Sequence, residues 1–304
     1  MRQILRFAFL SAGLLAGQAH ADELPLWEFG LGVAGLSIPD YRGSDVQRGY
    51  LLPLPYVQYR GDIFKIDREG AHGDLFRSDR FRLDISLNAG PPAKSNRNDA
   101  RSGMADIDFT VEAGPSLHVF LAYNEARDRV WSLRLPIRAA VATDLRHVQR
   151  IGWVFEPNLN FDATGLAGGW DIGVAVGPMY ASEDYHDYYY EVQPAFATAA
   201  RPAYDARAGY SGSRLTLAAS RRYPRFWVSA FTRYDNLSGA VFADSPLVKK
   251  NNSFMAGVGI AWILTTSRGK SQVGLPFALS QSKGERGIPP IAGDSSVRGS
   301  TSSP

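Results

Sequence analysis

Apolar and polar side chains alternate with a strict period of two residues through most of the chain. Because successive side chains of a β-strand point to opposite sides, this period is typical of strands whose two faces meet different environments. The alternation is clearest from Arg80 to Ala89, and comparable runs cover residues 106–121 and 130–141. Helical spacing is nowhere sustained, so the sequence predicts an all-β fold.

The alternating segments reach about ten residues or more, which is long for a soluble protein and suits a tilted strand that crosses a membrane. They number about twelve, within a range of about 10 to 14, and an even number is usual in bacterial barrels. The expected strands start at Trp27, Leu51, Asp62, Arg80, Asp106, Val130, Gly152, Trp170, Tyr188, Arg207, Phe226 and Phe254. All six tryptophans lie near expected strand ends, where membrane barrels carry aromatic girdles. A soluble β-sandwich also alternates but has shorter strands, so the prediction is a transmembrane antiparallel up-and-down β-barrel.

One connection fits this count badly. If the first strand starts in the periplasm, the segment from Pro91 to Ala105 becomes a periplasmic connection, and such connections are normally short. By contrast, Gly61-Asp62 and Tyr223-Pro224-Arg225 suit short periplasmic turns. Either the strand count slips near residues 91–105 or the protein breaks the rule.

The N-terminus has the pattern of a secretory signal peptide. Arg2 and Arg6 form a basic start, residues 7–17 form an apolar middle, and Ala19-His20-Ala21 is a small-residue cleavage site. The apolar stretch is too short to cross a bilayer as a helix. Residues 1–21 are therefore expected to be a signal peptide cleaved after Ala21, so that the mature chain starts at Asp22.

The C-terminus differs in composition from the rest of the chain. Residues 267–304 contain 19 Ser, Gly or Pro and one aromatic residue, Phe277, so they lack the apolar surface of a further strand. The expected domains are the signal peptide, an outer-membrane β-barrel over residues 22–266, and a flexible Ser/Gly/Pro-rich tail over residues 267–304.

Composition excludes several classes of protein. With no cysteine, the chain has neither disulfides nor thiolate metal sites. Loss of Arg2 and Arg6 from 33 basic residues leaves 31 against 30 acidic residues, a mature net charge of +1. This balance gives no reason to expect a nucleic-acid partner.

Three motifs with chemical associations have simpler explanations. Residues 30–35 match the GxGxxG pattern, but they lie within an expected strand, whereas a dinucleotide site needs the motif between a strand and a helix. His186 lies among acidic residues, which a solvated acidic loop explains as well as a metal site does. Ser116 and His118 share the inward face of one strand, but a third, orienting group cannot be placed. The prediction is therefore a non-enzyme without a metal site or cofactor.

Charges on the inward faces of the strands are the most informative polar set. On the expected registers, the candidate lumen charges are Arg80, Arg82, Asp84, Asp106, Asp108, Glu112, Arg134, Arg138 and Glu156, and the inward set also includes Asp162, Asp171, Glu191, Arg207, Arg214, Arg222, Arg233 and Asp235. Charges on a buried face must be paired or in contact with water. A water-filled lumen would make a pore for small solutes, whereas a closed network of arginines and carboxylates would make a plugged barrel that serves as a rigid platform. The sequence leaves both readings open.

Several motifs together resemble the MipA/OmpV family of Gram-negative outer-membrane proteins. They lie in order over about residues 27–266. The stretches are Pro39-Asp40-Tyr41-Arg42-Gly43-Ser44-Asp45, Leu52-Pro53-Leu54-Pro55-Tyr56, Tyr59-Arg60-Gly61, Ala105-Asp106-Ile107-Asp108, Gly177-Pro178-Met179-Tyr180, His186-Asp187-Tyr188-Tyr189-Tyr190-Glu191-Val192, Arg201-Pro202-Ala203-Tyr204-Asp205, Arg233-Tyr234-Asp235-Asn236-Leu237 and Asp244-Ser245-Pro246-Leu247-Val248.

The resemblance implies a barrel in the outer membrane of a Gram-negative bacterium, in contact with outer-membrane lipid. In this family the best-described role is a scaffold that joins a lytic murein transglycosylase (MltA) to a bifunctional penicillin-binding synthase in peptidoglycan growth. Other members are described as porin-like, which implies small solutes as alternative partners. Such barrels commonly end in a C-terminal aromatic residue, and the tail of this chain departs from that pattern. It leaves open a periplasmic segment that reaches peptidoglycan or a partner.

The family-motif residues themselves have two readings. In the simpler reading, the turns are formed by Gly43, Pro53, Pro55, Pro202 and Pro246. The aromatic residues at the membrane interface are then Tyr188, Tyr189 and Tyr190. In the functional reading, the loop with Asp40, Tyr41, Arg42 and Asp45 folds over or into the barrel and constricts it. The motif positions singled out are Asp40, Tyr41, Gly43, Ser44, Asp45, Pro53, Pro55, Tyr56, Tyr188, Tyr190, Arg201, Pro202, Tyr204, Arg233, Tyr234, Ser245, Pro246 and Leu247.

Overall fold

The computed structural model describes residues 25–60, 64–67, 70–73 and 75–267. The expected signal peptide, the Gly61-Asp62 turn and the expected tail beyond Ser267 lie outside the described residues. The strands are β1 (Trp27–Pro39), β2 (Gln47–Arg60), β3 (Phe64–Asp67), β4 (Gly70–Gly73), β5 (Phe76–Arg77), β6 (Phe81–Gly90), β7 (Phe109–Tyr123), β8 (Arg129–Thr143), β9 (Val148–Phe155), β10 (Asn158–Leu166), β11 (Trp170–Ala181), β12 (Gly209–Arg222), β13 (Phe226–Asn236) and β14 (Asn252–Thr266). The helices are α1 (Glu183–Tyr190) and the 3-10 turns η1 (Ser95–Arg97), η2 (Asp99–Arg101) and η3 (Pro194–Phe196).

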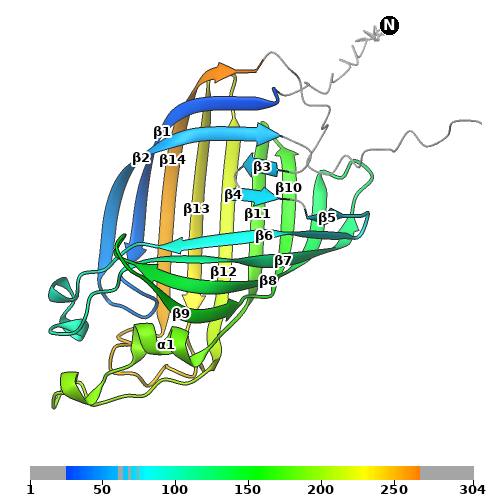
Figure 1. The fold of residues 1–304 in the computed structure, drawn as a ribbon. Coiled ribbons are helices and arrows are strands. Elements are labelled where there is room, and N and C mark those ends of the chain that lie inside the picture. The colour runs from blue at the N-terminus through cyan, green and yellow to red at the C-terminus, as the bar shows by residue number, and fades with distance from the viewer. Residues whose placement is uncertain (1–24, 61–63, 68–69, 74, 268–304) are drawn as a thin grey trace, which may run out of the picture.

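All the strands belong to one sheet that curves into a barrel (Figure 1). Its hydrogen-bonded order is β4-β3-β2-β1-β14-β13-β12-β11-β10-β8-β7-β6-β5, and β9 pairs with β8 and β11. The pairing of β1 with β14 joins the first and last long strands in antiparallel register. The predicted fold class, an antiparallel β-barrel, is therefore confirmed.

Two of the assigned strands are parts of one longer strand. Both β9 and β10 pair with β8 in the same register, since Phe155 lies opposite Ile137 and Asn158 lies opposite Arg134. They are interrupted at Pro157, whose nitrogen carries no hydrogen to donate. A single strand therefore runs from residue 148 to residue 166, where the sequence predicted a start at Gly152.

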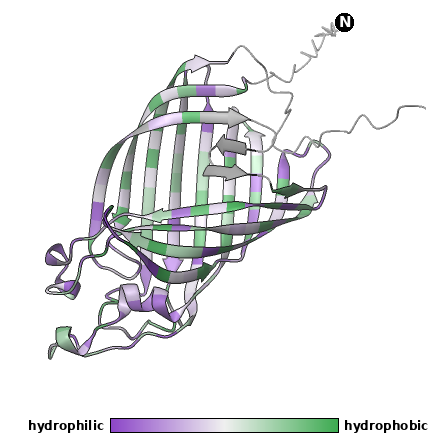
Figure 2. Cartoon of the chain, viewed as in Figure 1, coloured by the Kyte–Doolittle hydropathy of each residue, from purple (hydrophilic) through white to green (hydrophobic). Residues whose placement is uncertain are grey.

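The outer face of the barrel is apolar and the inner face is polar. In β8, Trp131 and Ile137 are 44% and 48% exposed, whereas Ser132 and Arg138, which directly follow them, are buried. The same alternation colours the strands in green and pale or purple bands in Figure 2. Because an outer face of this kind is stable only against lipid, the alternation explains how the barrel sits in a membrane.

The tryptophans do not all join the girdle. Trp131, Trp153 and Trp262 are exposed on the outer face, as predicted. Trp227 instead lies directly opposite Arg222 on the inner face, and its ring centroid is 5.9 Å from that of Tyr56. The prediction for Trp227 is wrong because position along a strand does not reveal which face a residue occupies.

The two ends of the barrel differ. Short turns at residues 124–128, 167–169 and 223–225 lie at the end where β1 begins and β14 ends. The long connections 40–46, 91–108, 182–208 and 237–251 lie at the opposite end, beside α1 (Figure 1). Short turns of outer-membrane barrels face the periplasm and long loops face outward, which assigns the two ends.

The misfit at residues 91–105 disappears in the structure. Three short strands, β3 to β5, occupy the chain between β2 and β6, so that β6 runs from the short-turn end to the long-loop end. The connection 91–108 therefore belongs with the long loops. The predicted strand count slipped in this region, as one of the two readings required.

Two predicted strands differ from the structure, one because it is part of a helix and the other because it starts later in the chain. The strand expected from Tyr188 is part of the helix α1, which buries Tyr185, His186 and Tyr190. The strand expected from Asp106 begins at Phe109, because the preceding residues belong to the loop, where Ile107 makes an isolated bridge with Ala93. A run of tyrosines such as residues 188–190 fits a strand in sequence, but packing against neighbouring loops decides its conformation. In the described part of the chain, every helix is too short or too polar to span a bilayer.

Candidate functional site

A chain of alternating arginines and carboxylates runs along the inner face of the barrel wall. The guanidinium of Arg138 lies 2.9 Å from a carboxylate oxygen of Glu112 and 2.7 Å from one of Glu156. The other oxygen of Glu156 lies 2.7 Å from Arg214 Nη1, and Arg214 Nε lies 2.8 Å from Asp235 Oδ1. These five residues come from β7, β8, the β9–β10 junction, β12 and β13, so the chain of ion pairs follows the order of the strands along the inner wall.

These charges are largely removed from water. The side chains of Arg138 and Asp235 are 6% and 3% exposed. Burial of unpaired charge is very costly, whereas alternation of sign lets each charge stabilise the next. Additional hydrogen bonds come from the Tyr185 hydroxyl, 3.0 Å from Glu112, and from Asn88 on β6. Each charge of the network is therefore paired with other members of the network.

A second cluster surrounds His118 on β7. Its Nε2 lies 3.1 Å from Asp84 Oδ2, and its Nδ1 lies 3.1 Å from Arg82 Nη2. Arg82 also pairs with Asp84 at 3.2 Å. Because both ring nitrogens of His118 are engaged, neither is available as a base for Ser116. The arrangement is that of a structural ion-pair cluster.

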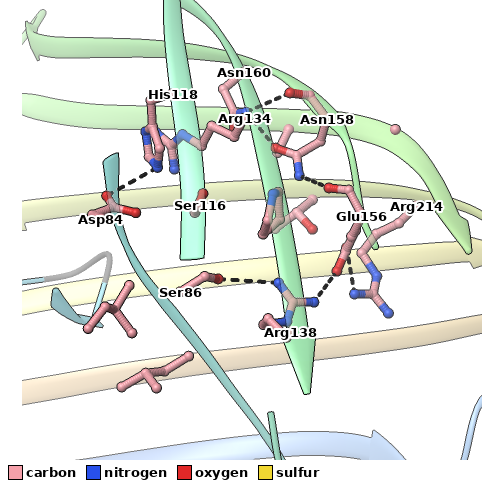
Figure 3. Close-up of a pocket in the computed structure, with 16 residues that line it drawn as sticks. Asp84, Ser86, Ser116, His118, Arg134, Arg138, Glu156, Asn158, Asn160 and Arg214 are labelled. Carbon is pink, nitrogen blue, oxygen red and sulfur yellow. Dashed lines mark hydrogen bonds and ion pairs between the residues drawn. The ribbon is translucent and has the colours of Figure 1, made fainter. Parts of the chain in front are cut away.

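A cavity of about 260 Å³ lies between these two clusters (Figure 3). Arg134, which pairs with Asp162 at 2.9 Å, projects into it beside His118. The polar side chains around it are Asp84, Ser86, Ser116, His118, Arg134, Arg138, Glu156, Asn158, Asn160, Arg214 and Thr216. The cavity is large enough for several water molecules or one small polar solute.

A third ion pair lies near the periplasmic end. Glu28 on β1 is fully buried and accepts hydrogen bonds from Arg222 on β12, the shorter at 2.8 Å. The Tyr56 hydroxyl lies 3.1 Å from the same carboxylate. Together with the ring of Trp227, these residues fill the inner face at this level.

The long loops interlock over the opposite end of the barrel. We call the loops 40–46, 91–108, 182–208 and 237–251 the cap. Its buried core consists of Tyr41, Ala93, Ala100, Ile107, Tyr190, Val192, Ala206, Leu237, Ala240, Phe242 and Leu247. The rings of Tyr190 and Phe242 stack with centroids 3.7 Å apart. The largest apolar cluster of the described residues therefore lies in the loops, which packs them as a folded unit.

Family-motif residues make many of the hydrogen bonds between cap loops. The Tyr41 hydroxyl donates to the carbonyl of Leu247 at 2.8 Å, and the Ser245 hydroxyl donates to the carbonyl of Tyr190 at 2.7 Å. Asp40 and Ser44 both accept from the amide of Asn98. In a separate set of contacts, Arg201 donates to the carbonyls of Ala100 and Ser102, and the Tyr204 hydroxyl donates to the carbonyl of Val241. The backbone N–H of Asp108 donates to the Tyr188 hydroxyl.

Arg42 joins the cap to the charge network. From the tip of the β1–β2 loop its Nε lies 3.1 Å from Asp235 Oδ1, and its Nη2 donates to the carbonyl of Ser211 at 2.8 Å. Its third nitrogen contacts Met179 Sδ at 2.9 Å. The loop with Arg42 thus folds into the mouth of the barrel, in the arrangement that the functional reading of the motif described.

Titratable groups of the cap have shifted pKa values because they are buried. Burial raises the pKa of Tyr41 to about 12. Burial lowers the pKa of His186 to about 4, and its ring contacts the Arg207 carbonyl and the Ser211 hydroxyl at 2.5 and 2.7 Å. The pKa of Asp187 rises to about 6 through burial and repulsion from Glu191, Asp205 and Glu183.

His186 therefore points away from the acidic residues that flank it in sequence. It is fully buried against Phe242, with ring centroids 4.8 Å apart. In the described ranges, no group of three or more His, Asp or Glu side chains has the arrangement of a metal site.

Three predicted lumen charges lie elsewhere. Asp106 and Asp108 precede β7 in the cap, where Asp106 pairs with the exposed Lys94 at 2.7 Å. Arg80 is exposed just before β6. Their expected inward position is wrong because the alternation was extended beyond the ends of the strands. Arg82, Asp84, Glu112, Arg134, Arg138 and Glu156 do lie together inside the barrel.

The remaining motif residues are distributed between strands and cap. Gly43, Asp45, Pro202 and Pro246 lie in cap loops, and Arg233 and Tyr234 lie on β13. Pro53, Pro55 and Tyr56 lie within β2 and not in a turn. Tyr188 and Tyr190 pack in the cap and not at a membrane interface, because α1 crosses the mouth.

Sequence reasoning missed several residues of this site. Asn98, Arg101 and Ser211 lie in loops or at a strand end, where periodicity carries no signal. Arg101 donates to the carbonyl of Tyr189 at 2.8 Å. For Arg42, the functional reading of its motif included a loop that folds into the barrel, but the sequence did not identify its partners Asp235 and Ser211.

Comparison with known proteins places this architecture among outer-membrane proteins. A family model described as MltA-interacting protein MipA matches residues 31–264. The MltA-interacting protein of Escherichia coli (strain K12) is 26% identical over 266 residues, which cover 84% of this chain and 98% of that protein. Outer membrane protein OmpV of Vibrio cholerae is 35% identical over 100 residues, which cover 30% of this chain and 37% of that protein. Among solved structures, the NanC porin aligns with 77% of this chain and 100% of its own, with 11% identity and a TM-score of 0.38.

Proposed function

Because this chain belongs to the MipA family of outer-membrane β-barrel proteins, we propose that it is a closed barrel that holds peptidoglycan enzymes at the outer membrane. The partners in this proposal are a lytic murein transglycosylase and a penicillin-binding synthase. The first partner is motivated by the name of the Escherichia coli relative, MltA-interacting protein. The barrel is located in the outer membrane of a Gram-negative bacterium.

The observation that carries the proposal is the closed charge network beneath the cap. Arg42 connects the cap to Asp235, and the alternating pairs continue along the inner wall through Glu156 to Glu112 on β7. A conducting pore needs a continuous path of water, and in this proposal the paired charges and the cap above them leave no such path. A barrel filled by its own side chains is better suited to anchor partners than to transport solutes.

The periplasmic turns are the surface available to such partners. Turns 124–128, 167–169 and 223–225 lie at the end opposite the cap. Since peptidoglycan lies on this side of the membrane, these turns and the segment after Ser267 provide the contacts in the proposal.

Site-specific photo-crosslinking in cells tests the proposal. A photo-reactive residue at Glu125, which is exposed in turn 124–128, should capture a lytic transglycosylase. The matched control is Leu145, which is 92% exposed in the turn at the cap end and should not. If photo-reactive residues at Glu125, Gly168 and Pro224 of a correctly folded barrel repeatedly capture neither enzyme, the scaffold proposal is wrong.

The second candidate function is a channel for small solutes, and the cavity beside Arg134 favours it. If solute passes through this cavity, the charge-reversing variants Arg134→Glu and Arg138→Glu should change the ion selectivity of the channel. Unchanged selectivity in a conducting barrel would place both side chains outside the path.

A further inference from the structure

An apolar recess of about 480 Å³ opens on the outer face of the barrel beside the cap. Its walls are Trp153, Phe155, Tyr180, Ala181, Ala208 and Gly209. The rings of Phe155 and Tyr180 are 6.5 Å apart with an angle of 29° between their planes, and Tyr180 is 5.7 Å from Tyr210. The recess exists because small residues lie between large rings, at the junction of β9, β11 and β12.

The strand register places this recess against lipid. Phe155 lies directly opposite Ile137 on β8, which is exposed on the outer face, and directly opposite Tyr180 on β11. Val154, the preceding residue, is fully buried on the inner side. Because the recess lies at the end with the long loops, it faces the outer leaflet.

Positive charge borders the recess on the side of the cap. Arg150 lies opposite Val141 on the outer face, three residues before Trp153 and closer to the cap. Arg207, which is exposed, directly precedes Ala208 in the wall. Exposed carboxylates on the same side are Glu183 and Asp184 at the start of α1, Asp144 in the turn between β8 and β9, and Asp205 in the loop before β12. Arg150 lies on β9 itself, and Arg207 directly precedes the wall residue Ala208.

We propose that the recess binds one acyl chain of a phosphorylated, multiply acylated glycolipid of the outer leaflet, with Arg150 bound to its phosphate. Each methylene group buried in the recess contributes about 0.8 kcal/mol, and the planar guanidinium matches phosphate oxygens in a bidentate geometry. The apolar wall of the recess lies farther from the cap than Arg150 does, in the same order as the acyl chains and the phosphorylated headgroup of such a lipid. This inference is independent of the scaffold proposal, because it concerns the outer surface at the opposite end.

Two variants separate the parts of the proposed site. Arg150→Glu reverses the charge at the headgroup, and Ala208→Phe fills the recess while keeping its apolar character. The matched controls are Arg225→Glu, an exposed arginine in a periplasmic turn, and Trp131→Ala, an outer-face aromatic near the periplasmic end. Heat-modifiable gel migration verifies that each variant forms a barrel.

Native mass spectrometry of the purified barrel, titrated with bisphosphorylated lipid A or with phosphatidylglycerol, measures the binding. We expect one molecule of lipid A per barrel, with affinity reduced about tenfold in each site variant and unchanged in both controls. Equal binding of phosphatidylglycerol and lipid A, or the same affinity in all four variants, would show only general lipid contact and overturn the proposal.

Discussion

Arg42 Nε, in a loop between the first two strands, lies 3.1 Å from Asp235 Oδ1 on the second-to-last strand of the barrel. The side chains are 13% and 3% exposed, so the pair is shielded from water. Asp235 is also bound by Arg214, which continues into the network along the inner wall. One side chain therefore makes the position of the cap depend on the charges inside the barrel.

Loss of this side chain should loosen the cap. Arg42→Ala removes the ion pair and the hydrogen bond to the Ser211 carbonyl, which together contribute about 2 kcal/mol. We expect faster proteolysis in the loop 182–208 and a lower temperature for the loss of compact gel migration. The control Arg146→Ala changes an exposed arginine in the turn between β8 and β9 and should do neither. Identical proteolysis of both variants would mean that Arg42 does not hold the cap.

Arg138 should be coupled energetically to its carboxylates. Arg138→Met leaves Glu112 and Glu156 buried without their shared cation, a change expected to cost about 3 kcal/mol. Glu156 keeps its ion pair with Arg214, so adding Glu112→Gln neutralises the carboxylate that has lost its ion pair and should restore part of the loss. Urea-induced unfolding in detergent of the two single variants and the double variant measures this coupling. Additive effects would contradict a connected network.

Gly30 should be required for close approach between β1 and β14. A Cβ atom at Gly30 would overlap the carbonyl oxygen of Trp262, where the register of the pair shifts. Gly35, on the same strand, has only Val258 Cγ2 at 3.9 Å from such an atom. We expect Gly30→Ala to lower the melting temperature of the barrel by several degrees and Gly35→Ala to leave it nearly unchanged. Equal melting temperatures would contradict the observed backbone spacing.

Lowering the pH should change the stability of the cap through two neighbouring groups, His186 and Asp187, whose effects are opposite. The pKa of His186 is lowered from 6.5 to about 4, so the stability that its neutral ring contributes is lost as the pH falls from 6.5 through 4. The pKa of Asp187 is raised from 3.8 to about 6, so the stability contributed by its protonated form is lost as the pH rises through 6. In the wild type the two effects oppose each other between pH 4 and 6.

Removal of one group should reveal the other. In Asp187→Asn we expect the cap to become steadily easier to cleave by a pH-tolerant protease from pH 6.5 to 4. In His186→Asn, a fall in pH from about 6 to 4 should instead make the cap harder to cleave. Parallel pH profiles in the two variants would contradict this assignment of the pKa shifts.

The sequence predicted the barrel well because its signal is repeated in every strand. Residues such as Ser132 and Arg138 alternate with Trp131 and Ile137, and the membrane imposes this period along the whole wall. Six of the nine charges singled out as lumen residues lie inside the barrel for the same reason. Periodicity thus assigned both the fold class and the face of most charged side chains.

The cap could not be predicted in the same way. Tyr188 and Tyr190 were predicted to lie in a strand, yet they form a helix that packs against Phe242 and Tyr41 from other loops. Asp106 appeared to continue an alternating strand, but its carboxylate binds the Ser95 amide within the loop. Such contacts join residues far apart in the chain, and a local pattern contains no information about them.

Single-channel recording tests the closed barrel most directly. The chain from Asp22 to Pro304, which is the mature protein that the signal-peptide pattern predicts, is refolded until its gel migration is heat-modifiable. It is then inserted into a planar bilayer in which a known porin gives clear steps. The charge network and the cap predict no discrete conductance steps from the folded protein. Reproducible steps that disappear when the barrel is heat-denatured would contradict the closed barrel and put the solute channel in its place.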